Sequence, residues 1–398
     1  MNIGMVIDNE FTGDIRVENE VIALEKAGFS VFILCLSFGN RNKIEKFGNS
    51  TIVRIDADLR IIKKMRALTN TIFNFYPDWW AKRINKFVEE YKINVLHIHD
   101  LYMFGAGFKA KGRYGLKIPI VGDLHENYVE GLKKYKFSNS FPGNLLISIP
   151  KWERTEIEWI SQLDYAITVI EEAVERYVSI GLERNKFKVV ANYVNIEEYL
   201  KMLTEYTVEK KECCFTVTYI GAFDIHRGLE SVVKAVSDIY KVIPNLKLVL
   251  VGRGKNLELL KQIAEQSGMS DNIVFEGWQP HSKLPAYINA SDVCIIPHLK
   301  TKHTDNTIPH KLFQYMLFEK PVVATDCNPI KRIVESENCG LIYESGDSKG
   351  FASKIIELFN DRDKMKVMGK LGKEAVLKKY NWNETSKNLI NMYQKIKL

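Results

Sequence analysis

The sequence predicts an α/β protein built from two doubly wound units of parallel sheet, and three observations lead to this prediction. Short, continuously apolar runs recur along the 398 residues, and amphipathic stretches of helical length separate most of them. These runs do not alternate with polar residues, which is typical of strands covered on both faces. The alternation breaks once, in a charged segment at residues 196–211. The chain therefore divides into two similar halves.

In the first half, apolar runs predict the strands in chain order, and the stretch Arg16–Ala27 has the pattern of a helix after the first of them. The predicted strands are Ile3–Ile7, Val31–Leu36, Ile52–Ile55, Val95–Ile98, Ile118–Val121, Ala166–Val169 and Phe187–Val190. We expect this domain to span residues 1–195, followed by a linker at 196–211.

The second half, residues 212–380, repeats the alternation. Its predicted strands are Phe215–Ile220, Leu246–Val251, Ile273–Phe275, Val293–Ile296, Pro321–Ala324 and Gly340–Ile342, and its clearest helices are Gly228–Tyr240, Leu257–Gln266 and Ser348–Asn360. A last helix at 381–398 follows a turn signal, and we expect it to pack back on the first domain.

One stretch of the second half, residues 306–326, combines a helix start with a misplaced cation. Thr307 is the predicted N-cap and Pro309 fits the first turn. The apolar stripe that follows consists of Leu312, Phe313, Met316 and Leu317. Lys311 lies at the end of the helix where the dipole favours anions, which makes sense if a phosphate binds there. The alternative is an ordinary surface lysine on a core helix.

Composition and charge narrow the class of protein. The net charge of +7 fits an anionic small molecule or an acidic membrane surface, and the dispersed basic residues without a known module make nucleic acid the weakest alternative. The first residues do not resemble a signal peptide, and no apolar run approaches membrane-spanning length. None of the six cysteines forms a CxxC pair, so we expect free thiols and a cytoplasmic location.

Polar side chains gather where predicted strands of the first half end. They are His99, Asp100, Asp123, His125 and Glu126. Metal ligands usually come with tighter spacing and a cysteine or third histidine, so we expect substrate contact, above all by His125, and no metal. Asp14 and Arg16 follow the first strand, in a loop that lacks a Gly-rich phosphate turn. This half is thus predicted to hold a substrate other than a nucleotide.

The second half carries phosphate-binding signals at its strand ends. Gly221 permits a tight turn after a strand, and Arg227 precedes a helix. Gly252 and Arg253 form another turn at the same edge. Arg227 alone reads as a solvated surface residue, but Lys311 at another helix start in this half favours a diphosphate site formed by both.

The order of motifs resembles that of family-4 glycosyltransferases with the GT-B fold, over nearly the whole chain. The resemblance rests on DIRVENEVIALEKAGFSV, GDLHENY, ANYVN, YIGAFDIHRGLE, LVLVGRG, VFEGW and NTIPHKLFQYMLFEKPVVATD. It implies two Rossmann-like domains facing each other across a cleft, a UDP- or GDP-sugar in the C-terminal domain and an acceptor in the N-terminal domain. It further implies transfer with retention of configuration, and neither a metal nor another cofactor.

The resemblance also assigns roles to residues. Arg227 and Lys311 would bind the diphosphate and stabilise its charge, and His125 would lie near the reacting sugar. The donor set it implies is Gly221, Arg227, Gly252, Arg253, Gly277, Asn306, Thr307, Ile308, Pro309, His310, Lys311 and Gln314, and the acceptor-side set is Asp14, Arg16, His99, Asp100, Asp123 and Glu126. The family pattern has two glutamates, seven positions apart, where this chain has Asn306 and Gln314. An amide still bonds a hydroxyl, but it brings no negative charge.

Basic and aromatic residues interleave in residues 59–91, and a second mixed segment covers 133–152. They fit peripheral contact with an anionic membrane, or else the aromatics cover the core of the domain. The leading interpretation is a hexosyltransferase that builds surface polysaccharide or glycoconjugate on a glycan or lipid-linked acceptor at the inner face of the membrane. The alternatives are a nucleotide-sugar epimerase of the same fold and a non-catalytic sugar-nucleotide binding protein.

Overall fold

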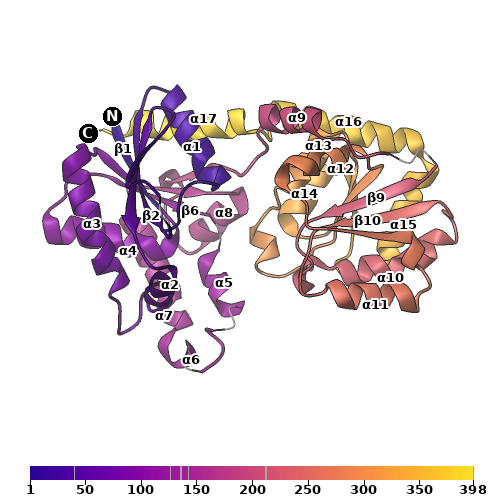
Figure 1. Ribbon diagram of the computed structural model, residues 1–398, viewed down its shortest axis with the longest axis horizontal. Coiled ribbons are helices and arrows are strands. Elements are labelled where there is room, and N and C mark those ends of the chain that lie inside the picture. The colour runs from indigo at the N-terminus through magenta and orange to yellow at the C-terminus, as the bar shows by residue number, and fades with distance from the viewer. Residues whose placement is uncertain (40, 126, 135–136, 142, 211–212, 398) are drawn as a thin grey trace. The chain divides into compact units, whose positions relative to one another are not determined.

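The computed structural model describes residues 1–39, 41–125, 127–134, 137–141, 143–210 and 213–397. Contacts divide the chain into two units, shown in Figure 1. The first unit consists of Met1–Ala191 and the residues from Thr385 onward, and the second of Asn192–Glu384. Most of the segment predicted as a linker forms helix α9 (Ile196–Glu205) and belongs to the second unit.

The first unit is built on one sheet in the order β3-β4-β2-β1-β5-β6-β7-β8. Its strands are β1 (Asn2–Val6), β2 (Ser30–Ser37), β3 (Ile44–Phe47), β4 (Ser50–Asp56), β5 (Val95–His99), β6 (Ile120–Leu124), β7 (Tyr165–Thr168) and β8 (Phe187–Val189). Every strand predicted for this half is present. The sequence prediction missed β3, an exposed edge strand that pairs antiparallel with β4, because two of its four residues are charged and three are exposed.

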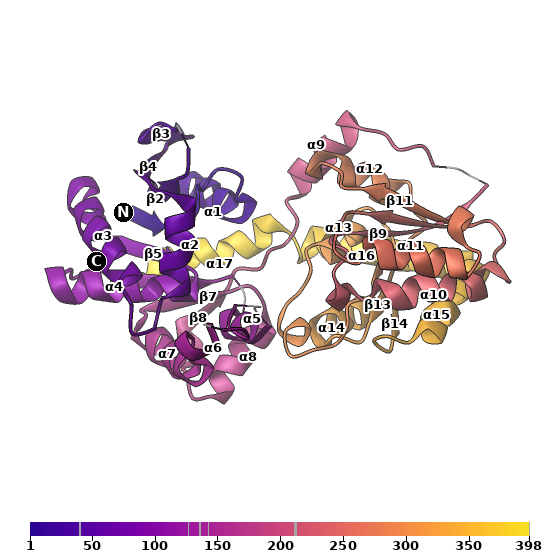
Figure 2. The same cartoon turned by 60° about the horizontal axis from the view of Figure 1, so that its bottom comes forward.

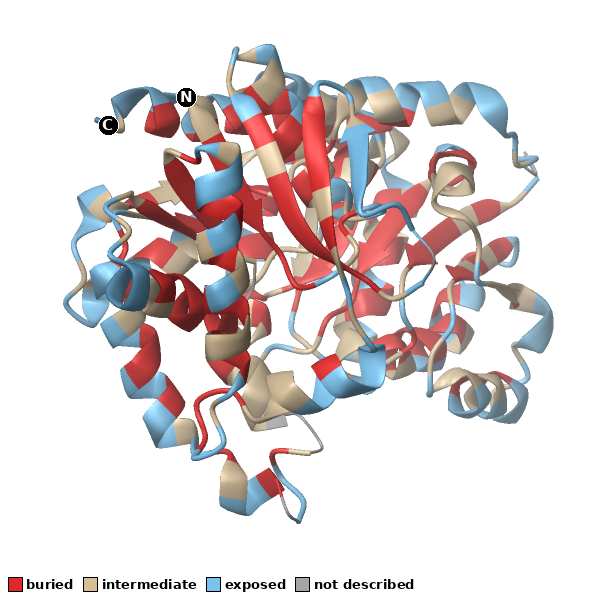
Figure 3. Ribbon diagram, turned by 60° about the vertical axis from the view of Figure 1, so that its left-hand side comes forward, coloured by how far each residue is buried: buried red, intermediate tan, exposed pale blue. Residues whose placement is uncertain are grey.

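Helices cover both faces of this sheet. They are α1 (Ile15–Lys26), α2 (Leu59–Ala67), α3 (Tyr76–Tyr91), α4 (Leu101–Tyr114), α5 (Tyr128–Lys134), α6 (Gly143–Leu146), α7 (Ile149–Gln162), α8 (Glu171–Ser179) and α17 (Trp382–Lys395). Figure 3 shows most of the strands as buried and an edge strand as exposed, whereas the helices alternate between buried and exposed residues. This is the burial expected of a parallel sheet between two helical layers, so the predicted fold class is confirmed for this unit.

The second unit has a sheet in the order β11-β10-β9-β12-β13-β14, with parallel pairing throughout. Its strands are β9 (Phe215–Ile220), β10 (Leu246–Val251), β11 (Ile273–Gly277), β12 (Val293–Ile296), β13 (Val322–Thr325) and β14 (Gly340–Tyr343). Its remaining helices are α10 (Leu229–Tyr240), α11 (Leu257–Gln266), α12 (Leu284–Asn289), α13 (Lys311–Leu317), α14 (Asn328–Ser336), α15 (Ser348–Asn360) and α16 (Arg362–Lys378).

Two apolar clusters lie on opposite faces of this second sheet, because successive strand residues point to opposite sides. Val293 and Ile295 belong to the cluster beneath α10, α11 and α15, whereas Cys294 and Ile296 belong to the cluster with α13, α14 and α16. Figure 2 shows α10, α11 and α15 grouped on their side of the sheet. The predicted doubly wound architecture is confirmed here as well.

The start of α13 corrects one prediction. The helix begins at Lys311 and is preceded by His310, so Thr307 is not its N-cap and Pro309 lies outside its first turn. Thr307 Oγ1 instead donates to the His303 carbonyl at 3.1 Å, within the loop that follows a short 3-10 turn. The apolar stripe of α13 is buried as the spacing predicts.

Helix α17 begins in the second unit, and from Thr385 its residues belong to the first. The Ala191 N–H donates to Thr385 Oγ1 at 2.8 Å, and Asn388 Nδ2 donates to the Val189 carbonyl at 2.9 Å. Further along, Tyr393 is buried in the first unit. Within the described residues, none of the helices combines the length and the apolarity needed to span a bilayer.

Candidate functional sites in the two units

Each sheet has a point where the strand order reverses, and polar residues gather at the carboxyl ends of the strands there. In the first unit β1 pairs with β2 on one side and with β5 on the other. In the second unit β9 pairs with β10 and with β12. Ligands of open α/β sheets bind outside such reversal points. The two candidate sites are therefore treated in turn.

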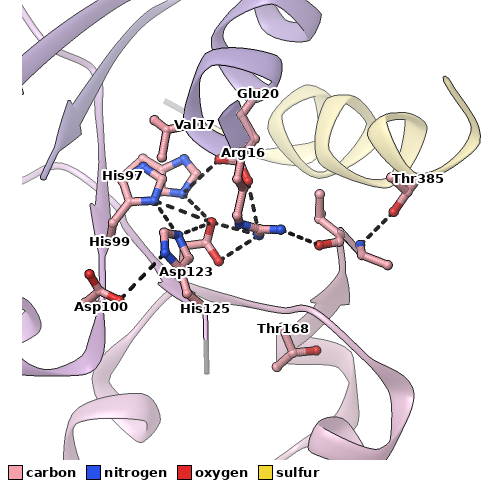
Figure 4. A network of polar contacts seen from close by, with 12 residues as sticks. Arg16, Val17, Glu20, His97, His99, Asp100, Asp123, His125, Thr168 and Thr385 are labelled. Atoms are coloured by element: carbon pink, nitrogen blue, oxygen red, sulfur yellow. Dashed lines mark hydrogen bonds and ion pairs between the residues drawn. The ribbon is translucent and has the colours of Figure 1, made fainter. Parts of the chain in front are cut away.

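In the first unit, a buried polar cluster surrounds Asp123 (Figure 4). One guanidinium nitrogen of Arg16 donates to both carboxylate oxygens of Asp123 at 3.0 Å, and another donates to the Val190 carbonyl at 2.9 Å. His97 Nε2 lies 3.5 Å from Asp123 Oδ2, and a 2.8 Å hydrogen bond joins His97 Nδ1 to the Tyr393 hydroxyl. The sequence predicted that Asp123 follows the end of its strand. In the structure it lies within β6, because the strand continues to Leu124.

Burial and the ion pairs set opposite protonation states within this cluster. Burial alone would raise the pKa of Asp123, but Arg16 and His125 outweigh it and hold that pKa well below its usual range. Burial raises the pKa of the neighbouring Glu20 to about 8, although Arg16 lies 3.1 Å away. Burial lowers the pKa of His97. The cluster thus holds one charged carboxylate against one guanidinium, with Glu20 largely protonated at neutral pH.

His125 and Asp100 are the members of this group that reach the surface. Their side chains are 22% and 32% exposed, whereas His99 and Asp123 are buried. Burial acts to lower the pKa of His125, but Asp123 and Asp100 outweigh it and raise that pKa to about 9. His99 stays neutral because burial holds its pKa well below the usual range. Protonated His125 Nε2 therefore donates to His99 Nδ1 at 3.0 Å, and its Nδ1 faces Asp100 Oδ1 at 3.7 Å.

Four side chains of the cluster have the spacing of metal ligands, which the sequence did not predict. Ligand atoms of Glu20, His97, His99 and Asp123 lie within 4.8 Å of one another. The Arg16 guanidinium already contacts the carboxyl groups of both Glu20 and Asp123 and provides the positive charge that a cation would otherwise provide. We therefore interpret the cluster as a buried ion pair between Arg16 and Asp123, with neutral His97 and His99 beside it.

Two further residues of the first unit were predicted to lie on the acceptor side, Asp14 and Glu126. Asp14 is the N-cap of α1 and accepts from the Val17 N–H at 3.4 Å. Glu126 lies outside the described residues. Sequence reasoning missed Glu20, His97 and Tyr393. Glu20 and His97 had weak signals, since Glu20 lies one helical turn after Arg16, and His97 and His99 share one face of a strand. Tyr393 had none, because it lies 296 positions from its partner His97.

In the second unit, three glycine turns meet at the carboxyl edge of the sheet. Gly221 and Gly252 have φ values of +146° and +144°, which favour glycine. A Cβ on Gly252 would lie 1.9 Å from the Gly221 carbonyl oxygen, and a Cβ on Gly221 would lie 2.5 Å from Lys311 Nζ. Gly252 also donates to the Gly277 carbonyl at 2.8 Å. The structure thus brings three predicted donor-site glycines together, with Gly221 beside Lys311, while the exposed Arg253 lies over the ring of Trp278 at 5.8 Å.

Arg227 is held by a histidine that the sequence did not single out. Arg227 Nη1 lies 3.0 Å from Nε2 of His298, which follows β12 and is buried. Burial and the nearby cations Lys311 and Arg227 hold the pKa of His298 well below its usual range, so the imidazole is neutral and its Nε2 accepts from the guanidinium. The two loops are also tied through their backbones, because the Leu299 N–H donates to the His226 carbonyl at 3.0 Å.

Lys311 contacts an aromatic face rather than an acid. Its Nζ lies 4.0 Å from the centre of the Tyr219 ring. Burial, followed by the charge of Arg227, holds the pKa of Lys311 well below its usual range. Among the described residues, no carboxylate lies within ion-pair distance of Lys311 or of Arg227. Two neighbouring cations without an acid are unfavourable unless an anion binds between them.

The two amides at the family's glutamate positions are engaged within the unit. Asn306 Nδ2 donates to the Lys302 carbonyl at 2.7 Å. Gln314 Nε2 donates to the Tyr199 hydroxyl at 2.5 Å, and that hydroxyl is 2.7 Å from Nε2 of His281. Ile308, Pro309 and His310 lie in the loop between them, before α13. Tyr199 and His281 were not predicted from the sequence, since they lie far from Gln314 along the chain.

Comparison with known families assigns both halves of the chain. Residues 15–198 match the family model described as Glycosyltransferase Family 4, and residues 208–375 match the one described as Glycosyl transferases group 1. The two models lie in the same order as the two halves predicted from the sequence.

Curated relatives are distant. The chain is 25% identical over 177 residues, 44% of its length and 46% of the relative's, to a GDP-mannose-dependent alpha-(1-6)-phosphatidylinositol monomannoside mannosyltransferase of Mycobacterium tuberculosis. It is 21% identical over 322 residues, 79% of its length and 77% of the relative's, to the N-acetyl-alpha-D-glucosaminyl L-malate synthase of Bacillus anthracis. The chain spans about half the length of the first curated relatives that it matches.

Solved structures agree on the fold over the whole chain. Sucrose-phosphate synthase from Thermosynechococcus elongatus superposes with a TM-score of 0.75 at 17% identity, covering 99% of this chain and 98% of that one. HepE of Anabaena, in complex with UDP, superposes with a TM-score of 0.73 at 13% identity over all of both chains. With the two family models matched in order and this fold present in both units, the chain belongs to the family-4 glycosyltransferases of the GT-B fold.

Proposed function

We propose that this protein transfers a sugar from a UDP- or GDP-sugar to a glycan or lipid-linked acceptor. One observation carries the proposal: Arg227 and Lys311 lie at the reversal point of the second sheet without a carboxylate partner among the described residues. A nucleoside diphosphate would give both side chains the negatively charged partner that they lack, and it would restore the ordinary pKa of Lys311. The glycines beside them leave room for the backbone to approach a phosphate.

In this proposal both cations act on the leaving group. As the bond between the sugar and the diphosphate breaks, negative charge grows on the phosphate oxygens, and Arg227 and Lys311 stabilise it. Because these two side chains provide the positive charge, we propose that the reaction needs no metal ion. Added EDTA should then leave the rate unchanged, and a rate restored only by a divalent cation would contradict this part of the proposal.

We propose that the first unit binds the acceptor, with His125 beside the reacting sugar. The raised pKa of His125 keeps the imidazole protonated at neutral pH, so it serves as a hydrogen-bond donor rather than as a general base. Asp100 lies beside it and is partly exposed. We further propose retention of configuration, which the anomeric coupling constants of the product measure by NMR.

The test is nucleotide release from a panel of UDP- and GDP-sugars with candidate acceptors. Arg227→Ala and Lys311→Ala should each lower the rate of release by at least about a hundredfold, in line with the loss of one charge-stabilising group. Lys366→Ala, at an exposed position on α16, is the matched control and should leave the rate unchanged. Rates within twofold of the unsubstituted protein for either site variant would show that the diphosphate binds elsewhere.

Two alternatives give different results in the same experiment. A nucleotide-sugar epimerase would convert the donor without an acceptor. A non-catalytic binding protein would bind the nucleotide sugar without releasing free UDP or GDP, and the engaged amides of Asn306 and Gln314 are the feature that favours it. For the enzyme, we propose a role in surface polysaccharide or glycoconjugate synthesis on the cytoplasmic side of the membrane. The phosphatidylinositol monomannoside in the name of the mycobacterial relative is one precedent for such an acceptor.

A further inference from the structure

The first unit has a cavity that lies apart from the buried Asp123 cluster. It holds about 460 Å³ and opens between α2, α5 and the start of α7. Most of its wall is apolar or aromatic, and two cations complete it. The lining residues are Lys63, Arg66, Ala67, Thr69, Tyr128, Gly131, Leu132, Ile147 and Trp152. A cavity of this size and composition fits an apolar group with a negative charge at one end.

The two cations differ in how they are held. Arg66 is fixed by Asp8, whose carboxylate lies 2.7 Å from Arg66 Nε and whose backbone carbonyl accepts from Arg66 Nη2 at 3.1 Å. Lys63, one helical turn earlier on α2, is exposed, and no carboxylate of the described residues pairs with it. The cavity therefore carries one uncompensated positive charge on its wall.

Contacts between side chains connect this cavity to His125. The ring of Tyr128 on the cavity wall packs on Tyr102 with their centres 5.2 Å apart. The Tyr102 hydroxyl lies 3.4 Å from Asp100 Oδ2, and Asp100 in turn faces His125. Three side chains, Tyr128, Tyr102 and Asp100, thus separate a molecule in the cavity from His125, the group proposed to contact the reacting sugar.

Exposed apolar residues flank the cavity on both of its walls. Beyond Thr69, the loop to α3 exposes 84% of Ile72, 46% of Phe73 and 65% of Phe75. Before Ile147, 79% of Phe141 and 76% of Leu145 are exposed. The two walls are joined, because Lys151 Nζ donates to the Asn70 carbonyl at 2.8 Å and Asn70 Nδ2 donates to Thr155 at 3.0 Å. Figure 1 shows α2, α6 and α7 at the same end of the unit.

Burial separates the aromatic residues of 59–91 into two groups. Trp80 is fully buried and Trp79 stacks under Arg83 at 3.5 Å, so both belong to the core and its cover. Phe73 and Phe75 are exposed beside the cavity. Exposed apolar side chains next to an unpaired cation such as Lys63 are typical of a surface that contacts an anionic bilayer.

We propose that this cavity binds the anionic, hydrocarbon-bearing part of the acceptor, while the exposed apolar residues around it rest on the bilayer that carries that acceptor. The inference rests on the proposed function, because it assigns the cavity to the acceptor of the same reaction. The negative charge pairs with Lys63, and the first carbons of the chain lie against Leu132, Ile147 and Trp152.

The first test fills the cavity. A Cβ on Gly131 meets no atom within 4 Å, and Gly131 lies in a helix without positive φ, so Gly131→Trp adds bulk at the cavity wall without backbone strain. Gly112, on α4, has the same open surroundings away from the cavity, and Gly112→Trp is the matched control. The probe is dodecyl phosphate below its micellar concentration. We expect Gly131→Trp to weaken its binding by at least about tenfold and Gly112→Trp to leave it unchanged.

A charge variant covers the case in which Gly131→Trp fails to fold. Lys63→Glu should abolish binding of dodecyl phosphate but not of neutral dodecyl maltoside, and Lys82→Glu, at an exposed position on α3, should change neither. Equal binding of dodecyl phosphate to Lys63→Glu and to Lys82→Glu would overturn the proposal. Binding of UDP or GDP to the same variants tests the proposed function separately, since the second unit is untouched.

The second test asks whether the amphiphile is presented by a membrane. The double variant Ile72→Ser and Phe141→Ser should no longer sediment with vesicles that contain anionic phospholipid, but should bind monomeric dodecyl phosphate like the unsubstituted protein. Neutral phosphatidylcholine vesicles should sediment neither form. If the double variant still sediments with anionic vesicles, the apolar residues do not contact the bilayer, and the proposal for the rim is wrong.

Discussion

Replacing His298 by leucine is expected to weaken the binding of a nucleoside diphosphate by removing the group that orients Arg227. His298 is buried and its Nε2 accepts from Arg227 Nη1 at 3.0 Å. Leucine has a similar size and occupies the same buried position, but it accepts no hydrogen bond. The guanidinium then loses its fixed position beside the diphosphate site.

The expected magnitude follows from that single hydrogen bond. A hydrogen bond to a charged group contributes about 1.5–3 kcal/mol, so the affinity for UDP or GDP should fall by about 10- to 100-fold. The affinity for the nucleoside alone should change by less than about twofold, because it lacks the diphosphate that Arg227 contacts. His298→Gln keeps an acceptor oxygen and should recover part of the loss.

Calorimetric titration of the unsubstituted protein, His298→Leu, Arg227→Ala and the double variant tests the reasoning. Since His298 acts through Arg227, the double variant should bind the diphosphate no more weakly than Arg227→Ala. Losses that add in the double variant would mean that His298 acts independently of Arg227. An equal loss of nucleoside and nucleotide binding would indicate damage to the fold of the unit instead.

Three further outcomes are expected. Gly228→Ala should lower the free energy of unfolding by about 1–3 kcal/mol, because φ is +67° and the new Cβ would lie 1.9 Å from a backbone carbonyl oxygen; Gly112→Ala, in open space within a helix, should raise it by about 0.5–1 kcal/mol. Both are measured by urea unfolding. Asp8→Asn should cost about 1–2 kcal/mol in the same assay, because it leaves Arg66, whose side chain is 34% exposed, without its carboxylate, and a cost near zero would contradict the ion pair. The folded-state pKa of His125, about 9, lies above its ordinary value of 6.5, so the stabilisation it contributes is complete below pH 6.5 and is lost as the pH rises through 9. Melting temperatures of His125→Gln should accordingly show a smaller decline over this range than those of the unsubstituted protein.

The sheets could be predicted from the sequence because buried parallel strands are continuously apolar. The second unit shows this best, since Phe215–Ile220, Leu246–Val251 and Val293–Ile296 have the predicted limits. β3 was missed because an exposed edge strand needs no apolar face. The end of β6 was placed too early because Gly122 and Asp123 look like loop residues until a buried partner for the carboxylate is known.

The parts of the sites that the sequence did not reveal depend on partners far apart in the chain. Arg16 and Asp123 are 107 positions apart, and Arg227 and His298 are 71 apart. No local pattern marks such a pair, because each residue alone looks like a solvated charge or a single structural histidine. Strand order and register bring them together, and these follow from the whole fold.

The last helix has a consequence for how the protein is made. Leu389, Met392 and Tyr393 of α17 are buried in the first unit, and Tyr393 bonds His97 on β5. The ribosome reaches these residues only after it has synthesised the entire second unit. Until then, the nascent first unit exposes the apolar surface that α17 covers, and His97 lacks its hydroxyl partner. The half of the molecule that is synthesised first is therefore the one that reaches its final packing last, and its surface is open to chaperones during translation.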